Sequence, residues 1–236
     1  MRHPEPRAGI QPPVRGFGVQ GTTSSPPSTV RPANLPAAGG TSVTRAVEPR
    51  AAGCDTSPVT PPQPRPFGTV DELLTVLDDR RGGDVVTALD HHLQCAALLA
   101  LDAPGDVDLQ IAGLVHDVAS SVQPRPSGDH APAGADLVRG LLGDRVADLV
   151  AGHVDAKRYL VTVEPAYRLV LSENSTATLV LQGEAMGTDE LAAFERAPLR
   201  EDWVRLRRAD DRAKVIGAAV PGLAHWRPKL EGLARR

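Results

Sequence analysis

The sequence predicts an all-α domain that follows a disordered N-terminal tail. Of the 22 prolines, 14 lie before Phe67, with Ser, Thr and Gly between them. Such a segment cannot bury enough apolar surface to offset its ordering entropy, so residues 1–66 are predicted to be disordered. Residues 67–236 are rich in Ala, Leu and Val, and their one β-branched run, residues 161–163, is short. Closely packed helices are therefore favoured over a sheet.

Helix signals follow one another from Thr69 onward. Thr69 and Glu72 have capping-box spacing, Asp106 can cap a third helix, and Pro132 stands at a helix-start position. The expected helices of the first half span residues 70–79, 86–102, 107–118, 133–142 and 144–160.

The second half is also expected to be helical. Pro165 opens a short helix that reaches Leu171, Ser172 or Asn174 can cap the next one, and Thr188 can cap another. The expected helices span residues 165–171, 173–182, 189–196, 201–216 and 222 to the C-terminus.

Charge and composition limit the classes of partner. The net charge of −3 favours neither nucleic acid nor an anionic membrane as a partner. Two cysteines, Cys54 and Cys95, cannot form a disulfide framework, and the second lies in an apolar helical pattern. No apolar segment follows Arg2 and no run is long enough to cross a membrane, so we expect a cytoplasmic protein. The oligomeric state stays open.

The pair His116-Asp117 ends the third expected helix. Adjacent helical residues diverge by about 100°, so an imidazole and a carboxylate can converge on one point. This combination suits Fe, Mn or Zn. Five of the seven histidines fall in the same middle segment, and Asp210 and Asp211 add carboxylates on a late helix. The histidines are His91, His92, His116, His130 and His153.

One His, an adjacent His-Asp pair and a distant Asp, all on separate helices, is the pattern of the HD superfamily of metal-dependent enzymes. The chain resembles this superfamily over residues 67–236, which implies an HD-domain helical bundle. Four runs further resemble the phosphonate-degrading HD-domain oxygenases, the 2-amino-1-hydroxyethylphosphonate dioxygenase-like family. These runs are DHHLQCA (90–96), HVDAKRYL (153–160), LQG (181–183) and LRRADDRAK (206–214).

The resemblance implies a dinuclear iron centre and a redox reaction. Two iron ions, as an Fe(II)/Fe(III) pair, would use O2 as co-substrate to cleave the C–P bond of a small 1-hydroxyphosphonate. The products would be phosphate and an amino acid such as glycine. Asp117 would bridge the two ions. The implied metal ligands are His91, His116, Asp117, His130, His153 and Asp210.

Two ligand positions stay open on the residues alone. His91 and His92 are both flanked by apolar positions, and only the resemblance favours His91. Asp210 competes with Asp211, which lies three residues before Lys214 and can form a helix ion pair with it.

Several residues suit an anionic substrate. Lys157 lies one turn beyond His153, although Asp155 or Glu164 are alternative structural partners for its ammonium group. Ser175 and Thr178 lie near a helix start, where free N–H groups favour anions, and Arg207 shares the face of Asp210. The resemblance implies catalytic roles for Asp117 and Lys157. The implied substrate-binding set is Asp84, Lys157, Ser175, Thr178, Gln182 and Arg207.

Three departures from the family pattern leave the exact phosphonate open. Ser120 stands where the family usually has another His, Asp84 replaces a Glu, and Arg81 falls at or beside the place of a Tyr. A trimethylammonium-bearing 1-hydroxyphosphonate is one alternative substrate. Two other functions also stay open: an HD phosphohydrolase acting on a phosphate ester or nucleotide, and a non-catalytic HD-fold binding module.

Overall fold

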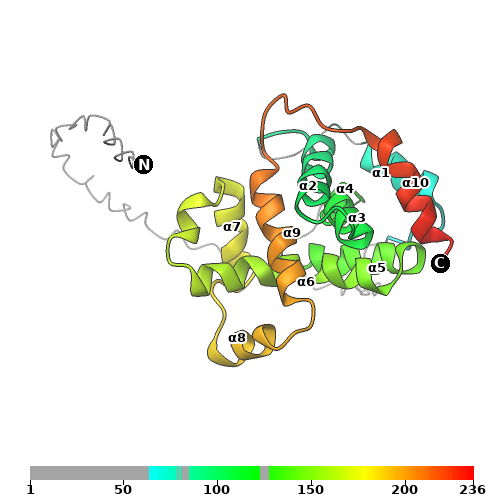
Figure 1. Cartoon of the computed structure of the whole chain (residues 1–236). Coiled ribbons are helices and arrows are strands. Elements are labelled where there is room, and N and C mark those ends of the chain that lie inside the picture. The colour runs from blue at the N-terminus through cyan, green and yellow to red at the C-terminus, as the bar shows by residue number, and fades with distance from the viewer. Residues whose placement is uncertain (1–63, 79, 81–84, 123–127) are drawn as a thin grey trace, which may run out of the picture. The chain divides into compact units, whose positions relative to one another are not determined.

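The computed structural model describes residues 64–78, 80, 85–122 and 128–236 (Figure 1). All of these belong to one compact unit, and their regular structure is entirely helical. The all-α prediction is therefore confirmed. The predicted tail lies outside the described residues except for positions 64–66, so its boundary at residue 66 stays a prediction. Arg81 and Asp84 also lie outside the described residues.

Most elements agree with the expected helices to within a few residues. They are α1 (Val70–Leu77), α2 (Ala88–Asp102), α3 (Val107–Val115), α4 (Val118–Val122), α5 (His130–Leu142), α6 (Asp144–Val163), the 3-10 helix η1 (Tyr167–Val170), α7 (Glu173–Leu181), α8 (Thr188–Glu195), α9 (Arg200–Arg212) and α10 (Leu223–Ala234).

Side-chain caps explain where several helices begin. The hydroxyl of Thr69 accepts from the Glu72 N–H at the start of α1, and Asp106 and Ser172 cap α3 and α7 in the same way. Each cap satisfies a backbone N–H that has no partner within the helix. The prediction for Thr188 was wrong by one residue. Gly187 is the N-cap of α8, and its N–H donates to the Glu190 carboxylate at 2.9 Å.

Two further differences concern helix ends. The expected helix 107–118 is divided, because α3 ends at Val115 and His116 is its C-cap. The expected helix 201–216 ends early, at Arg212. There the side-chain amide of Gln94 captures the backbone of Val215: it donates to the Val215 carbonyl at 3.0 Å and accepts from the Val215 N–H at 2.9 Å. These bonds replace helical ones and turn the chain.

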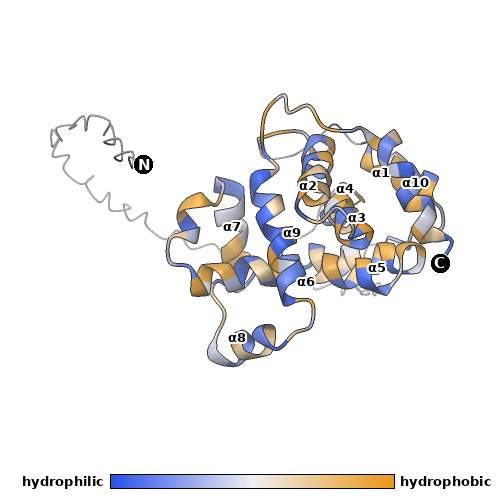
Figure 2. Ribbon diagram, in the orientation of Figure 1, coloured by the Kyte–Doolittle hydropathy of each residue, from blue (hydrophilic) through white to orange (hydrophobic). Residues whose placement is uncertain are grey.

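The core lies where α2, α3, α5, α6 and α9 pack on one another. Figure 2 shows apolar and polar faces on most of these helices, as packing around one core requires. α1 and α10 pack at one end of the domain, and α7 and α8 lie at the other (Figure 1). Within the described part, no helix combines the length and the apolarity needed to cross a membrane. Fully buried core side chains include Leu99, Leu109, Ile111, Leu149, Leu206 and Trp226.

Close approach between α6 and α9 depends on Gly152. A Cβ at this position would lie 2.2 Å from Cε2 of the Trp203 indole. Trp203 also donates from Nε1 to the Asp148 carbonyl at 2.8 Å, which fixes its ring against α6. The contact matters for the site because α6 carries His153, the residue after Gly152, and α9 carries Asp210.

Candidate metal and substrate site

His91, His116 and Asp210 form one group of candidate metal ligands. They come from α2, from the C-cap of α3 and from α9, and each offers an atom within 4.8 Å of the others. His91 Nε2 lies 3.2 Å from His116 Nε2 and 3.2 Å from Asp210 Oδ1. All three side chains are buried or nearly so. Three ligand atoms therefore converge on one point in the interior.

Asp117, His130 and His153 form a second group. His130 begins α5, and His153 lies in the middle of α6, which packs on α5. The Nε2 atoms of the two histidines are 3.0 Å apart, and they lie 3.4 Å and 3.6 Å from Asp117 Oδ1. This group has two nitrogens and one carboxylate oxygen, as the first group does.

Asp117 connects the two groups. Its Oδ1 faces His130 and His153, whereas its Oδ2 lies 3.5 Å from His116 Nε2 and 4.0 Å from His91 Nε2. A carboxylate with one oxygen turned toward each group is placed to bridge two cations.

The backs of three histidine rings are held by main-chain carbonyls. The Nδ1 atoms of His91, His116 and His153 lie 2.9, 2.9 and 2.7 Å from the carbonyl oxygens of Ala213, Gly113 and Val150. A carbonyl only accepts, so each Nδ1 carries the proton and donates it. In the neutral ring Nε2 then presents a lone pair, which is the usual arrangement of a metal-binding histidine.

This tautomer provides a test of whether a metal fits. In their neutral forms His91 and His116 point two lone pairs at each other across 3.2 Å, with Asp210 adding a carboxylate oxygen. Three electron-rich atoms at this distance need a cation between them, either a proton or a metal. The residues present therefore fit a metal ion at this position.

The pKa values agree with a set of neutral imidazoles and ionised carboxylates. Burial lowers the pKa of His116 to about 4. Burial alone would raise the pKa of Asp117 and Asp210. However, the neighbouring histidines hold the pKa of Asp117 well below the usual range, and Arg207, followed by the histidines, does the same for Asp210. For His91 burial lowers the pKa, but Asp210 and Asp117 outweigh it and leave the pKa raised. A metal would displace the proton that His91 otherwise attracts.

The two open ligand choices look different in the structure. Asp210 turns Oδ1 toward the histidines, whereas Asp211 accepts from Arg207 and from the Tyr167 hydroxyl. His92 packs in the interior with its ring centroid 5.7 Å from that of His116, and its Nδ1 has no hydrogen-bond partner among the described residues. His91 and Asp210, rather than their sequence neighbours, face the first position.

Lys157 lies one turn beyond His153, and its ammonium group is buried beside α7. Nζ donates to the Thr178 hydroxyl at 3.0 Å and to the Ser175 carbonyl at 3.3 Å. Burial, with a further contribution from the charge of Arg207, lowers its pKa to about 8. The structure thus brings Lys157, Ser175 and Thr178 together.

Within the described residues, neither alternative partner suggested for Lys157 forms an ion pair with it. Asp155 pairs with Arg158 and Glu164 with Arg208. The ammonium group is therefore directed at α7 and not at the neighbouring acids of its own helix.

Arg207 is buried and its three guanidinium nitrogens are engaged within the protein. Nη1 donates to Asp210 Oδ2 at 2.6 Å, Nη2 donates to Asp211, and Nε donates to the Tyr167 hydroxyl at 3.0 Å. The guanidinium group that was expected to bind the substrate is thus bound to two protein carboxylates and a tyrosine hydroxyl in this structure.

The other expected residues lie less centrally. Gln182 is the C-cap of α7, at the opposite end of that helix from Ser175. Ser120 lies exposed on α4, and its N–H donates to the Asp117 carbonyl at 2.9 Å. The position of Asp84 lies outside the described residues.

Lys214 was missed as a site residue. Its Nζ donates to the hydroxyls of Ser172 and Ser175 at 3.0 and 3.3 Å, on the same helix start that Lys157 approaches. The helical spacing of three residues predicted an ion pair between Lys214 and Asp211. However, α9 ends at Arg212, where Gln94 binds the backbone of Val215, so Lys214 lies beyond the helix and reaches α7.

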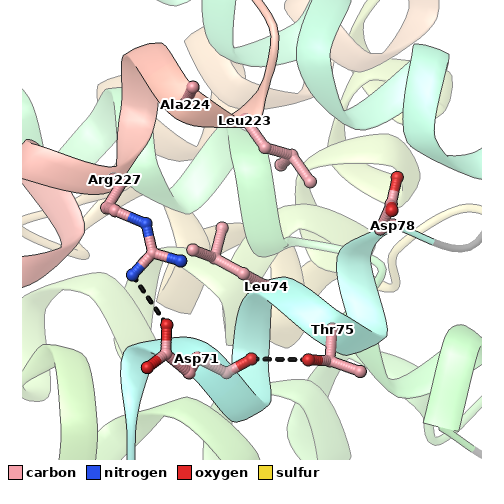
Figure 3. A pocket seen from close by; sticks show the side chains of 7 residues that line it. All are labelled: Asp71, Leu74, Thr75, Asp78, Leu223, Ala224 and Arg227. Atoms are coloured by element: carbon pink, nitrogen blue, oxygen red, sulfur yellow. Dashed lines mark hydrogen bonds and ion pairs between the residues drawn. The ribbon is translucent and has the colours of Figure 1, made fainter.

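A separate pocket lies between α1 and α10 (Figure 3). Arg227 pairs with Asp71 across it at 2.7 Å. The pocket shares no lining residue with the metal or substrate sets. Its lining residues are Asp71, Leu74, Thr75, Asp78, Leu223, Ala224 and Arg227.

Comparison with known proteins gives a consistent result. Residues 89–191 match the HD domain. The chain is 35% identical over 155 residues to hydroxymethylphosphonate dioxygenase of Gimesia maris, which covers 62% of this chain and 77% of the relative. It is 29% identical over 177 residues to 1-hydroxy-2-(trimethylamino)ethylphosphonate dioxygenase (glycine-betaine-forming) of Leisingera caerulea. That match covers 70% of this chain and 90% of the relative.

A third relative, an uncharacterized protein of Acanthamoeba polyphaga mimivirus, is 28% identical over 172 residues, with 67% of this chain and 78% of the relative covered. The HD match contains the His-Asp pair and the four other histidines of the site region. The structure agrees with these similarities. Its described residues form an all-helical domain that holds two groups of candidate metal ligands, with Asp117 between them. The chain belongs to the HD-domain phosphonate dioxygenase family.

Proposed function

We propose that the protein is a di-iron oxygenase that uses O2 to cleave the C–P bond of a small 1-hydroxyphosphonate. The products are phosphate and a carboxylic acid, which is an amino acid such as glycine when the substrate is 2-amino-1-hydroxyethylphosphonate. One observation carries the dinuclear part of the proposal: each carboxylate oxygen of Asp117 faces a separate group of candidate ligand atoms. The similarity to two relatives named as phosphonate dioxygenases supports an oxygenase over a dinuclear hydrolase.

In this proposal the six ligands bind two iron ions. His91, His116 and Asp210 hold one ion, His130 and His153 hold the other, and Asp117 contacts both. When bound, an Fe(II)/Fe(III) pair supplies the redox chemistry and a template for the substrate. Imidazole and carboxylate ligands suit iron, and neither group of candidate ligands among the described residues contains a cysteine.

The phosphonate binds beside α7. Lys157 is mostly protonated at neutral pH, because its pKa of about 8 lies above 7. Its buried ammonium group therefore offers a positive charge in a region of low dielectric, where attraction to a dianion is strong. Ser175 and Thr178 place their polar groups on the same side, and Gln182 completes the proposed contacts. Arg207, also expected there, has all three guanidinium nitrogens bound within the protein, so we propose that it acts through a metal ligand and not on the substrate.

The other end of the substrate is expected to meet Asp84. The Leisingera relative is named for a trimethylammonium phosphonate and the Gimesia relative for hydroxymethylphosphonate, which has no nitrogen. The family thus accommodates different groups at this end. We propose a small 1-hydroxyphosphonate as the substrate class and use experiment to choose among its members.

The test is phosphate release from a panel of 1-hydroxyphosphonates, with and without O2. The panel contains hydroxymethylphosphonate, 2-amino-1-hydroxyethylphosphonate and its trimethylammonium analogue. We expect O2-dependent phosphate release from at least one member, close to two irons per chain, and the EPR signal of a spin-coupled mixed-valent pair.

Two results contradict the proposal. Hydrolysis of phosphate esters or nucleotides without O2, by protein that holds only Mg or Mn, would assign the chain to the HD phosphohydrolases. Ligand binding without metal or turnover would make it a non-catalytic binding module.

A further inference from the structure

The two oxygens of Asp210 have different partners. Oδ1 lies 3.2 Å from His91 Nε2 and 3.8 Å from His116 Nε2, so it faces the first metal position. Oδ2 accepts from Arg207 Nη1 at 2.6 Å. A charge-assisted bond of this length holds Oδ2 away from the metal position. The carboxylate can then offer only one oxygen to an ion.

Arg207 is itself held by two residues that the proposed reaction does not use. Its Nε donates to the Tyr167 hydroxyl at 3.0 Å, and its Nη2 donates to Asp211 Oδ1. The ring closes because the Tyr167 hydroxyl donates to Asp211 Oδ2. Tyr167 comes from η1, whereas Arg207 and Asp211 lie on α9.

The ring is buried, and burial gives it physical weight. Tyr167 and Arg207 are each 4% exposed, and the Asp211 side chain is 11% exposed. Burying a guanidinium and two carboxylates is expensive in solvation, and replacing such a group by apolar residues is often neutral or stabilising. A buried ionic ring is thus a poor means of stabilising the fold, and its geometric effect on Asp210 is the better explanation.

Tyr167 also connects the ring to the substrate side. Its aromatic ring packs with Leu160, Val161 and Leu179 in a small apolar cluster, and Leu179 lies on α7 next to Thr178. The position of the hydroxyl is therefore set by packing between α6, η1 and α7.

We propose that Tyr167 and Asp211 are positioning residues that hold Arg207 so that Asp210 presents a single oxygen to the metal ion bound by His91 and His116. The inference rests on the metal centre of the proposed function, but not on its C–P chemistry. Neither Tyr167 nor Asp211 lies in either group of candidate ligands.

The test compares Tyr167→Phe with Tyr159→Phe, because the chain has two tyrosines. The Tyr159 ring stacks on Phe194 at 4.6 Å, outside the Arg207 ring. The full chain is stripped of metal by a chelator, and Mn(II) binding is measured by titration calorimetry and by the EPR spectrum of the bound ion. Asp211→Asn is the second variant, because it keeps the shape and removes the charge.

We expect Tyr167→Phe and Asp211→Asn to weaken the first metal site by about 10- to 100-fold, the range typical of lost outer partners of metal ligands. The second site, the melting temperature without metal and the KM for substrate should change little. The bound Mn(II) spectrum should change in these two variants and not in Tyr159→Phe.

Unchanged affinity and an unchanged spectrum in both variants would overturn the proposal. Equal weakening of both metal sites together with a lower Tm would also overturn it, because that result describes a structural role. Failure of the proposed function gives a different result: wild-type protein that binds two metals but releases no phosphate. Wild-type protein that binds no metal refutes both.

Discussion

The two groups of candidate metal ligands differ in origin and in depth. The first combines residues from α2, from the C-cap of α3 and from α9, and its His116 is fully buried. The second takes its two histidines from the adjacent helices α5 and α6, and its Asp117 side chain is 34% exposed. The first group therefore depends on packing between distant segments, whereas the second depends on one helical hairpin and is more open to solvent.

This difference predicts unequal behaviour of the two metals. The first position is also supported from outside, because Arg207 binds the back of Asp210, and Ala213 and Gly113 accept from its histidines. We expect the first ion to be held more tightly and the second to exchange more readily. Removal of individual ligands, and of the residues that support them, tests this contrast.

Asp117→Ala should remove both metals, so that no difference in affinity between the two positions remains. Asp117 is the one residue in the two groups whose oxygens face both positions. Elemental analysis should find less than one metal per chain, and phosphate release should fall to background. Two retained metals in this variant would contradict the bridging role.

His91→Ala and His130→Ala should separate the two positions. His91 joins α2 to the segment after α9 through the Ala213 carbonyl, so its loss should remove the first ion and lower the Tm. His130→Ala should release only the second ion, leave about one metal per chain and change the Tm little. Metal content and thermal melting measured together check this. The same loss from both variants would show that the positions are not independent.

Lys157→Ala should leave both metals in place and affect the substrate. A hydrogen bond to a charged group contributes about 1.5–3 kcal/mol, which corresponds to a rise in KM of roughly 10- to 100-fold. Steady-state kinetics with the best phosphonate of the panel gives the number, and metal content serves as the control. An unchanged KM would remove Lys157 from the substrate site.

The pH dependence of the wild type should follow from the same residue. Burial, and then the charge of Arg207, lowers the pKa of Lys157 to about 8. The ammonium form is present below that pH and is lost as the pH rises through it. KM should therefore rise between about pH 7.5 and 9 in the wild type and stay flatter in Lys157→Ala. Parallel profiles would assign the titration to another group.

Gly152→Ala should disturb the alignment of the two groups through the fold. The added Cβ would lie 2.2 Å from the rigid Trp203 indole, so α6 and α9 must move apart. Overpacking of this kind typically costs about 1–3 kcal/mol, measured by denaturant unfolding. Gly140→Ala on α5, where nothing lies within 4 Å of the new Cβ, is the matched control. It should be neutral or slightly stabilising.

Local sequence determined most of the helices and the identity of the candidate ligands. Capping residues such as Asp106 and Ser172 mark helix starts because they satisfy N–H groups within one turn of chain. The motif spacing placed His91, His153 and an aspartate at 210 or 211 on separate helices, as the structure has them, and His116 at the end of a third. His130 was expected in a loop just before a helix, and it is the first residue of α5. These features depend on neighbours a few residues away, and a sequence displays such neighbours directly.

Tertiary structure decided which of two adjacent residues faces the site. Asp210 and Asp211 differ by about 100° around one helix, and both faces are polar enough for either role. Tyr167, which is more than forty residues from Asp211 in sequence, forms hydrogen bonds with both Asp211 and Arg207. The early end of α9 has the same kind of cause. Gln94 on α2 forms hydrogen bonds with the backbone of Val215, and Lys214 then donates to Ser172. Helix periodicity describes the faces of one helix, but only packing against other segments determines which of those faces meets the metal and which is paired elsewhere.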